Sequence, residues 1–324
     1  ARPDEQADRE KQAALHGVEL SVTDAVPTLE NASLAAGCAG VSILGQGRID
    51  AALLAAYHAL GVRYLSTRTI GYDHIDLDHA QSIGLRVCSA SYAPNGVADF
   101  TVMMILMCLR HYKQALWRGQ VNDFSLTGLQ GREMKDLTIG IIGTGRIGAQ
   151  VVRNLSGFGC RILAYDLRRN PAVESQVTYV DFDTLLAQSD VITLHMPLLD
   201  SNRHIINREA IAKMRDGVVI VNCSRGELAD IEALIEGIET GKIGALGMDT
   251  VEGDEGIIHA DHRVDILPNR NWFYLHQFRN VIMTQHMAFY TDAAVASMVA
   301  CGIGGICQMA AGEPCPTELT GPVQ

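Results

Sequence analysis

The stretch "LTIGIIGTGRIGAQVVRNL" (residues 137–155) joins an apolar run, a glycine-rich turn and an amphipathic run without a break. Its glycines Gly143, Gly145 and Gly148 follow the order G-x-G-x-x-G, and Asp166 ends the next apolar run. This order is typical of a strand, turn and helix that bind the pyrophosphate of a dinucleotide. The first glycine permits the tight turn, the second admits the phosphate, and the third lets helix and strand pack closely. The stretch therefore predicts a Rossmann domain.

The residues at the end of the next expected strand bear on which dinucleotide binds. Asp166 would accept hydrogen bonds from the adenosine ribose and repel a 2′-phosphate, which favours NAD over NADP. Arg168 and Arg169 follow directly, and either could reach a phosphate. The sequence therefore predicts NAD and leaves the strictness of that preference open.

Runs rich in β-branched residues alternate with helical patterns along the rest of the chain. Strands are expected at 18–22, 40–44, 63–67, 86–90, 137–143, 161–166, 191–196, 217–224, 244–250 and 281–286. Helices are expected at 49–60, 95–117 and 291–311. Such alternation implies parallel βαβ units. The sequence thus predicts an α/β protein with two doubly wound parallel-sheet domains, whose ligands bind at the C-terminal ends of the strands.

Composition limits the class of protein. The 324 residues are 48% hydrophobic and 19% charged, with a net charge of −11, which argues against nucleic acid or an anionic membrane as partner. The longest apolar run, residues 101–109, is too short to cross a bilayer, and no signal peptide is recognisable. The eight cysteines form no C-x-x-C pair, so we expect reduced thiols, a cytoplasmic location and no metal.

Two polar side chains stand just after expected strands. Arg225 follows the strand at 217–224, where a guanidinium can hold a carboxylate bidentately. His286 ends the last strand of the second set, where an imidazole can exchange protons near neutral pH. Considered singly, Arg225 is equally compatible with a surface ion pair, and His286 with a packed core position.

Seven motifs in order extend these observations over nearly the whole chain. They are "STRTIGYDHID" (66–76), "YAPNGVADFT" (92–101), "GTGRIG" (143–148), "LHMPL" (194–198), "VNCSRGELAD" (221–230), "GMDTVEG" (247–253) and "QHMAFYT" (285–291). With them the chain resembles the D-isomer-specific 2-hydroxyacid dehydrogenases. The long segment before "MTQH" and the ending "AFYT" resemble the D-lactate, D-2-hydroxyisocaproate and (R)-phenyllactate dehydrogenases, including the vancomycin-resistance D-lactate dehydrogenases.

The resemblance implies a domain organisation and an assembly. A discontinuous, flavodoxin-like substrate domain would comprise residues 1–93 and 291–324. A Rossmann NAD-binding domain would comprise residues 94–290. The enzymes of this family also suggest a homodimer formed through the NAD domain.

The resemblance further implies a role for each matching residue. Arg225 would hold the substrate carboxylate, helped by backbone N–H groups around Ile70 and Gly71. His286 would donate the proton in reduction and accept it in oxidation. NAD contacts would come from Gly143, Gly145, Arg146, Ile147, Gly148, Asp166, Met196, Pro197, Asn202, Cys223, Ser224 and Asp249.

One position departs from the family pattern. The acid that partners the histidine lies five residues after the aspartate of "MDT" and is usually glutamate, whereas Asp254 stands here and Glu255 follows it. We expect Asp254 to be the partner, with Glu255 as the alternative. A carboxylate there would keep the imidazole of His286 protonated near neutral pH, where reduction needs it.

The substrate side chain is the least determined feature. It would meet the loop that begins at Leu44, together with Tyr92, Phe289 and Tyr290. Lactate enzymes of the family often carry a bulky aromatic residue in that loop, whereas "LGQG" (44–47) is slim. The expected substrate is therefore a pyruvate, 2-oxoisocaproate or phenylpyruvate type of 2-oxo acid, with room for a branched or aromatic group. A glycerate, phosphoglycerate or formate dehydrogenase, or an NAD(H)-sensing corepressor, are the alternatives.

Overall fold

The computed structural model describes residues 1–321. The chain divides into two compact units, each described by itself below. The smaller unit contains residues 1–93 and the described residues from Tyr290 onward, and the larger unit is Pro94–Phe289.

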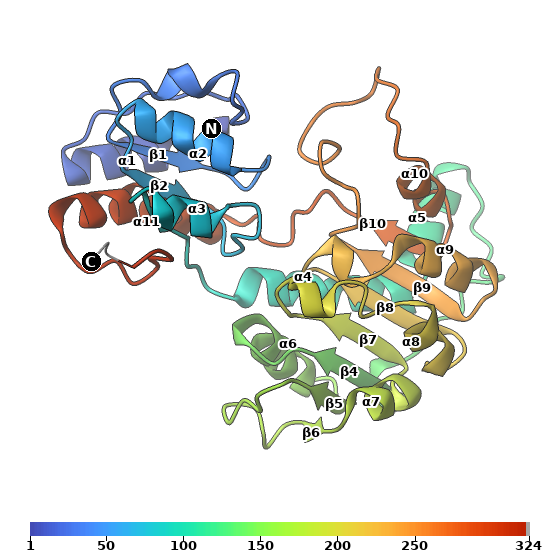
Figure 1. Cartoon of the computed structure of the whole chain (residues 1–324). Helices are drawn as coiled ribbons and strands as arrows, with labels where there is room; N and C mark the ends of the chain where they lie inside the picture. Colours follow the sequence, from blue (N-terminus) through green and yellow to red (C-terminus); the bar gives the residue numbers. More distant parts are fainter. Residues whose placement is uncertain (322–324) are drawn as a thin grey trace. The chain divides into compact units, whose positions relative to one another are not determined.

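The larger unit is built on a seven-stranded sheet in which every pair of neighbours is parallel. The strands are β4 (Thr138–Ile142), β5 (Arg161–Tyr165), β6 (Thr178–Tyr179), β7 (Val191–Leu194), β8 (Val218–Asn222), β9 (Ile243–Met248) and β10 (Val281–Met283). Their order is β10-β9-β8-β7-β4-β5-β6 (Figure 1). The direction of winding therefore reverses between β4 and β7, which is where such sheets bind their ligands.

Helices cover both faces of this sheet, and all of them except α5 bury apolar side chains in the core. They are α4 (Asn95–Leu109), α5 (Tyr112–Gln120), α6 (Arg146–Ser156), α7 (Phe182–Gln188), α8 (Arg208–Lys213), α9 (Ile231–Glu239) and α10 (Arg270–His276), with short 3₁₀ turns η3 (Met134–Asp136), η4 (Asp200–Asn202) and η5 (Gly226–Leu228). One core cluster joins α4 and α6 to the sheet. A second core cluster joins the four helices α7, α8, α9 and α10 to the sheet. Val151, Val152 and Leu155 of α6 are completely buried, as the amphipathic pattern predicts.

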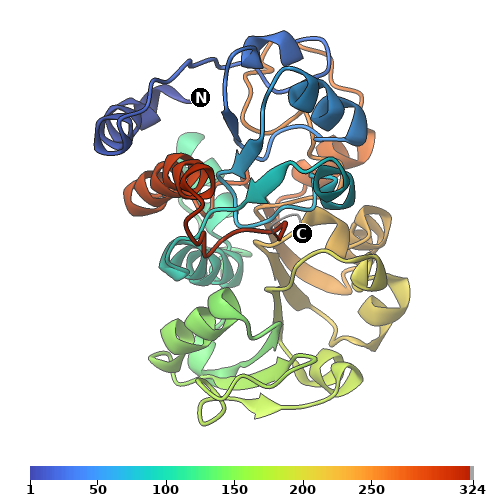
Figure 2. The same ribbon diagram turned by 60° about the vertical axis from the view of Figure 1, so that its left-hand side comes forward.

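The smaller unit has a three-stranded parallel sheet, β1-β2-β3. Its elements are η1 (Pro3–Glu5), α1 (Gln6–His16), η2 (Ala32–Ala35), β1 (Gly40–Ile43), α2 (Ala51–Ala59), β2 (Tyr64–Thr67), α3 (Leu77–Ser82), β3 (Arg86–Cys88) and α11 (Asp292–Ala311). Leu53, Leu65 and Val87 lie in its core. The helix α11 packs on all three strands and on α1 (Figures 1 and 2).

The C-terminal segment runs along the outer side of β3. Ser89 donates its backbone N–H to Thr317 O (3.0 Å), and Leu319 N–H donates to Val87 O (2.8 Å). The Arg86 guanidinium holds the Glu318 carboxylate through two bonds of 2.7 and 2.8 Å. Residues 317–320 therefore cover the edge of the small sheet.

The helix α11 is the one element of the described chain that is long and apolar enough to cross a membrane. Length and composition alone are weak evidence, because the core helix of a globular protein passes the same test. Val299, Gly302 and Met309 of α11 are buried within the smaller unit. This packing accounts for its apolar composition.

Two expectations about secondary structure are wrong, and one strand was not expected. Residues 18–22 form no strand, because Val22 is 53% exposed and the small sheet offers this segment no partner. The helix expected at 95–117 breaks into α4 and α5 at His111, which has a φ of 51°. There Leu109 O accepts a hydrogen bond from Arg132 N, which takes the place of the next helical bond. The two-residue strand β6 was too short to produce a sequence pattern.

Candidate active site

The glycine-rich turn connects β4 to α6 with the geometry that its sequence predicts. Gly143 has a φ of 92°, and a Cβ there would lie 2.5 Å from His195 O. A Cβ on Gly148 would collide with Gly143 O. Gly145, in contrast, precedes α6 and faces open space, so a phosphate can approach the helix N-terminus. The turn therefore fits the pyrophosphate of a dinucleotide.

Asp166 is tied to this turn. Its Oδ2 accepts hydrogen bonds from Thr144 N (2.6 Å) and Thr144 Oγ1 (3.1 Å), and its Oδ1 accepts from Arg168 N (3.0 Å). A carboxylate has about four acceptor positions, so ribose hydroxyls can still bind. The side chain of Arg169 lies near Glu174 (3.9 Å) and the ring of Tyr179. Asp166 therefore lies directly after β5 and beside the glycine turn.

Five more of the expected cofactor residues follow β7 or β8 in the chain: Met196, Pro197, Asn202, Cys223 and Ser224. Asn202 donates to Pro197 O (2.8 Å) and Met196 Sδ (3.4 Å), and Ser224 Oγ donates to Met196 O (2.6 Å). Cys223 is buried in the core cluster beside α4, and burial raises the pKa of its thiol. Arg146 is exposed at the start of α6, and the neighbouring Ile147 packs against the core.

Asn222 and Asp249 join the ends of β8, β9 and β10. Asn222 Nδ2 donates to Arg225 O (2.7 Å), and Asn222 O accepts from Asp249 N (2.9 Å). The Asp249 carboxylate is 1% exposed and accepts from Thr284 Oγ1 (2.6 Å), Met287 N (2.9 Å) and Ala288 N (2.8 Å). One continuous network therefore holds the turn of Arg225 and the loop of His286.

Arg225 is half-buried immediately before η5, and its Nη1 donates to Ser224 O (2.9 Å). The next residue must be glycine, because a Cβ on Gly226 would overlap the backbone of Val251 and Glu252. This close approach places the segment that carries Asp254 against the turn of Arg225.

His286 adopts a left-handed backbone conformation, with a φ of 53°. This conformation is uncommon for a residue with a side chain and is often found at functional sites. The His286 ring lies 6.2 Å from the Phe289 ring and 6.1 Å from the His259 ring, between ring centroids. His259 Nε2 also lies 3.2 Å from His286 O. No sequence pattern singles out His259, because it lies in a long polar segment.

Asp254 and Glu255 occupy different environments. Asp254 is half-buried, and its Oδ2 accepts from Val251 N (3.2 Å), whereas Glu255 is exposed. The pKa of Asp254 is raised to about 6, mainly by burial and also by nearby carboxylates, while the Val251 N–H acts to lower it. A carboxyl group with a pKa near neutrality is typical of catalytic machinery.

Another histidine, His195, lies next to the glycine turn and differs from His286 in the proton chemistry that it can perform. His195 follows β7, is 9% exposed, and contacts Thr193 Oγ1 through Nε2 (3.0 Å). Burial lowers its pKa to about 3. His195 therefore stays neutral at physiological pH and cannot supply a proton there.

The smaller unit holds the other expected substrate contacts. Thr69 Oγ1 donates to Gly71 O (2.6 Å), which shapes the loop of Ile70 and Gly71. Beside it, a Cβ on Gly45 would lie 2.9 Å from Thr69 Cγ2, so the loop that follows Leu44 passes close to Thr69. Tyr92 is half-buried after β3.

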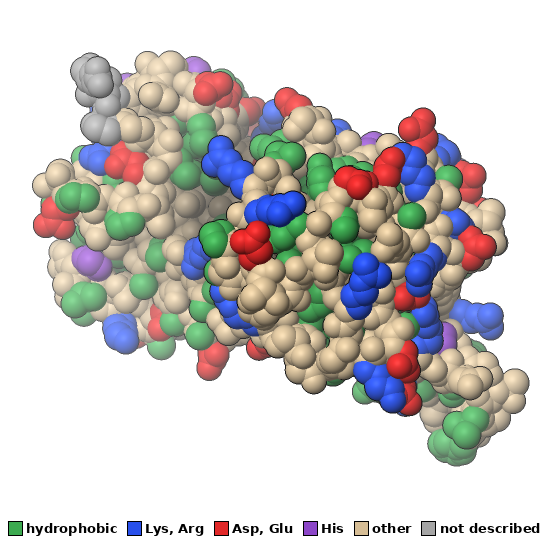
Figure 3. Space-filling model, turned by 90° about the horizontal axis from the view of Figure 1, so that it is seen from below, with side chains coloured by type: hydrophobic (Ala, Val, Ile, Leu, Met, Phe, Trp, Pro, Cys, Tyr) green, Lys and Arg blue, Asp and Glu red, His purple; other side chains and the backbone are tan. Residues whose placement is uncertain are grey.

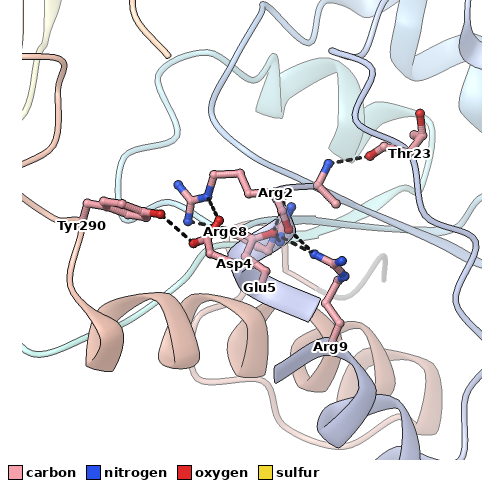
Figure 4. Close-up of polar contacts among 8 residues, drawn as sticks. Arg2, Asp4, Glu5, Arg9, Thr23, Arg68 and Tyr290 are labelled. Atoms are coloured by element: carbon pink, nitrogen blue, oxygen red, sulfur yellow. Dashed lines mark hydrogen bonds and ion pairs between the residues drawn. The ribbon is translucent and has the colours of Figure 1, made fainter. Parts of the chain in front are cut away.

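Tyr290 has partners in the N-terminal segment. Its hydroxyl donates to Asp4 Oδ2 (2.8 Å), and the Arg2 guanidinium lies 4.7 Å from its ring centre (Figure 4). The ring itself is 44% exposed. Phe289 belongs to the larger unit, so the two aromatic residues of "AFYT" lie on opposite sides of the unit boundary.

The fold and the site define a class of protein: a Rossmann-type, NAD-dependent oxidoreductase. The model of the D-isomer specific 2-hydroxyacid dehydrogenase NAD binding domain matches residues 102–288. The chain is 42% identical over 286 residues to the aromatic 2-oxoacid reductase of Clostridium sporogenes, covering 88% of this chain and 86% of that protein. It is 38% identical over 305 residues to the D-lactate dehydrogenase of Escherichia coli, covering 94% and 93%.

A solved D-lactate dehydrogenase from Treponema pallidum superposes with a TM-score of 0.87 at 31% identity, over 99% of this chain and 98% of that chain. The chain therefore belongs to the D-isomer-specific 2-hydroxyacid dehydrogenase family, in the branch of the D-lactate dehydrogenases. Its cofactor is NAD, and it acts on the CH–OH group of 2-hydroxy acids.

Proposed function

We propose that the chain reduces a 2-oxo acid with a branched or aromatic side chain to the (R)-2-hydroxy acid. Arg225 binds the carboxylate, and His286 protonates the oxygen at C2. Bound NADH supplies the hydride that C2 receives. The observation that carries this proposal is the network through Asn222 and Asp249, because it fixes an arginine and a histidine at one edge of the sheet that carries the glycine turn.

The proton chemistry follows from the residues of the larger unit. His286 enters the reduction as imidazolium and leaves it neutral, so it must regain one proton from solvent in each cycle. Asp254 in its ionised form favours the imidazolium, because opposite charges stabilise each other. Arg225 keeps its charge throughout and offers a bidentate donor pair to the substrate carboxylate. In oxidation the same groups act in reverse.

The preference for a bulky substrate rests on two observations. Gly45 has no side chain, so the loop that follows Leu44 adds no bulk beside Thr69. The name of the Clostridium sporogenes relative states an aromatic 2-oxo acid as its substrate. We also propose that the smaller unit is the substrate domain. Its substrate contacts would include Tyr92 and Tyr290, together with Phe289 of the larger unit.

A kinetic panel tests it. With NADH, kcat/KM for phenylpyruvate and 2-oxoisocaproate should exceed that for pyruvate. The same panel with NADPH should give much lower values, because Asp166 repels a 2′-phosphate. A strong preference for pyruvate would refute the side-chain assignment, and the absence of turnover with all three acids would refute the proposed reaction.

We also propose that the enzyme is a cytoplasmic homodimer. Met103 of α4 is 41% exposed, and Phe158 after α6 is 38% exposed, at a hollow of about 540 Å³. Trp117 of α5 is 64% exposed, and Phe124 in the following loop is 78% exposed. Exposed apolar surface of this kind marks protein interfaces. On the face that Figure 3 shows, apolar side chains lie among side chains of both charges. Light scattering should give twice the chain mass, and Trp117→Glu should lower it.

A further inference from the structure

Glu5 is a completely buried carboxylate in the smaller unit. Its Oε2 lies 2.6 Å from Arg68 Nη1 and 3.4 Å from Arg9 Nη1, and its Oε1 lies 3.1 Å from Arg2 Nη2 (Figure 4). Burying a carboxylate is costly unless it is paired and hydrogen-bonded. Arg2 and Arg9 keep 24% and 16% of their side chains exposed, whereas Arg68 keeps only 6%. The pair of Glu5 and Arg68 is therefore the buried centre of this cluster.

Arg68 is held along its whole length. Its backbone N–H donates to Ile43 O (2.8 Å) at the end of β1. A Cβ on Gly302 would lie 2.7 Å from Arg68 Cγ and 3.0 Å from Arg68 Cδ, so α11 passes directly against the aliphatic part. The guanidinium then reaches Glu5 of η1. The end of β1, the helix α11 and the turn η1 thus all contact Arg68.

The residues on either side of Arg68 shape the loop that follows β2. Thr67 Oγ1 and Thr69 Oγ1 are 2.6 Å apart, and Thr69 Oγ1 donates to Gly71 O. Successive side chains of an extended segment point to opposite sides. Arg68 therefore fixes one side of this segment while the two threonines fix the other, so a shift of Arg68 turns the threonines and the loop with it.

We propose that Arg68, anchored by the buried Glu5 carboxylate, is a positioning residue for the backbone N–H groups of Ile70 and Gly71 that receive the substrate carboxylate. This inference rests on the proposed function, because it assigns that loop to the 2-oxo acid. Arg68 acts through the loop and does not touch the substrate. The N-terminal turn η1 is then part of the support of the substrate site.

The first experiment compares two variants with the same change of charge. Glu5→Gln should raise the KM for phenylpyruvate by about tenfold or more, the factor that corresponds to about 1.4 kcal/mol. Its kcat and its KM for NADH should stay near those of the wild type, because the groups that hold the proton and the cofactor lie in the larger unit. Glu10→Gln is the control, since Glu10 is exposed on α1 and contacts Gln6 (2.8 Å). It should change none of these values.

The second experiment separates positioning from stability. Replacing a buried ion pair by apolar residues often restores stability, so the double variant Glu5→Met with Arg68→Met should recover the Tm that Glu5→Gln loses. Its KM for phenylpyruvate should remain raised. Gly302→Ala, whose added Cβ would press on the aliphatic part of Arg68 and on Ser42 Oγ while both charged groups are kept, should raise the same KM.

Three outcomes would overturn the inference. The first is a wild-type KM in Glu5→Gln, and the second is a KM that recovers together with Tm in the double variant. In both, the proposed reaction would stand. The third is a wild-type enzyme that reduces no 2-oxo acid, which would refute the proposed function and this inference together.

Discussion

The two units hold their candidate residues in place by different physical means. In the larger unit, the buried Asp249 carboxylate accepts two backbone N–H groups and a hydroxyl from the loop of His286. In the smaller unit, the loop of Ile70 and Gly71 follows Arg68, which a buried ion pair holds. The first arrangement fixes the main chain directly, and the second fixes it through a side chain. Changes to the His286 loop of the larger unit should therefore lower kcat, whereas changes in the smaller unit should alter the binding and choice of substrate.

The largest effect should come from the proton donor. His286→Ala is expected to lower kcat by about 10²–10⁴-fold, the range that general acid–base catalysis supplies. The affinity for NADH, measured by fluorescence titration, should stay near that of the wild type, because the glycine turn is intact. A kcat close to that of the wild type would remove His286 from the mechanism.

Next in size is the loss of the acceptor that holds the His286 loop. Asp249→Asn replaces one of the two carboxylate oxygens by an NH₂ donor that faces either Met287 N or Ala288 N, which should cost about 1–3 kcal/mol of stability. We expect a clear loss of kcat because the loop of His286 shifts. Glu252→Gln removes the same charge from a half-buried residue that contacts His204 (2.7 Å), and serves as control. Equal activity in the two variants would show that the loop does not depend on Asp249.

Asp254, the acid that we propose as the partner of His286, should give a smaller effect with a defined pH dependence. The folded pKa of Asp254 is about 6, above its ordinary value of 3.8, so folding favours the neutral carboxyl. This contribution to stability is complete below pH 3.8 and is lost as the pH rises through 6. Asp254→Asn should therefore raise Tm at pH 8, by the equivalent of about 2–3 kcal/mol at most, since one pKa unit is about 1.4 kcal/mol.

The same variant should lose activity, because the amide cannot stabilise the imidazolium. Its pH–rate profile, compared with that of Glu255→Gln, identifies the partner of His286. Glu255→Gln should leave the profile unchanged, since Glu255 is exposed. If the profile shifts only in Glu255→Gln, the assignment of Asp254 is wrong.

The smallest effect should concern selectivity in the smaller unit. Leu44→Tyr adds bulk to the slim loop beside Thr69 and should lower kcat/KM for phenylpyruvate relative to pyruvate by about tenfold, a factor typical of a hydrophobic pocket. The kcat for pyruvate should stay near the wild-type value, because His286 and Arg225 are unaffected. A parallel loss for both acids would indicate damage to the loop instead of a change in selectivity.

Local patterns predicted the features that depend on neighbours in sequence. The glycine turn, the acid after β5 and most strands follow from residue type and spacing, because a tight turn and a buried parallel strand admit few side chains. The prediction of a strand at 18–22 was wrong, because a strand also needs a neighbouring strand to pair with. The break at His111 was not predicted because it depends on Arg132, which is more than twenty residues away in sequence.

Side chains that act through distant partners were harder to foresee. Asp249 was expected as a cofactor contact, and its bonds to the His286 loop depend on how β9 and β10 lie side by side. Glu5 carried no signal, because an acid in a polar N-terminal stretch usually meets solvent. His259 likewise stands beside His286 through the course of a long segment.

The C-terminal segment along β3 has a consequence for the solubility of the protein. Ser89 N and Val87 O, which residues 317–319 now satisfy, would become unpaired at the edge of a three-stranded sheet if this segment detached. An open edge of this kind is a template on which another chain can add a strand. Chains that end before Thr317 should consequently self-associate even where every residue of the active site is intact.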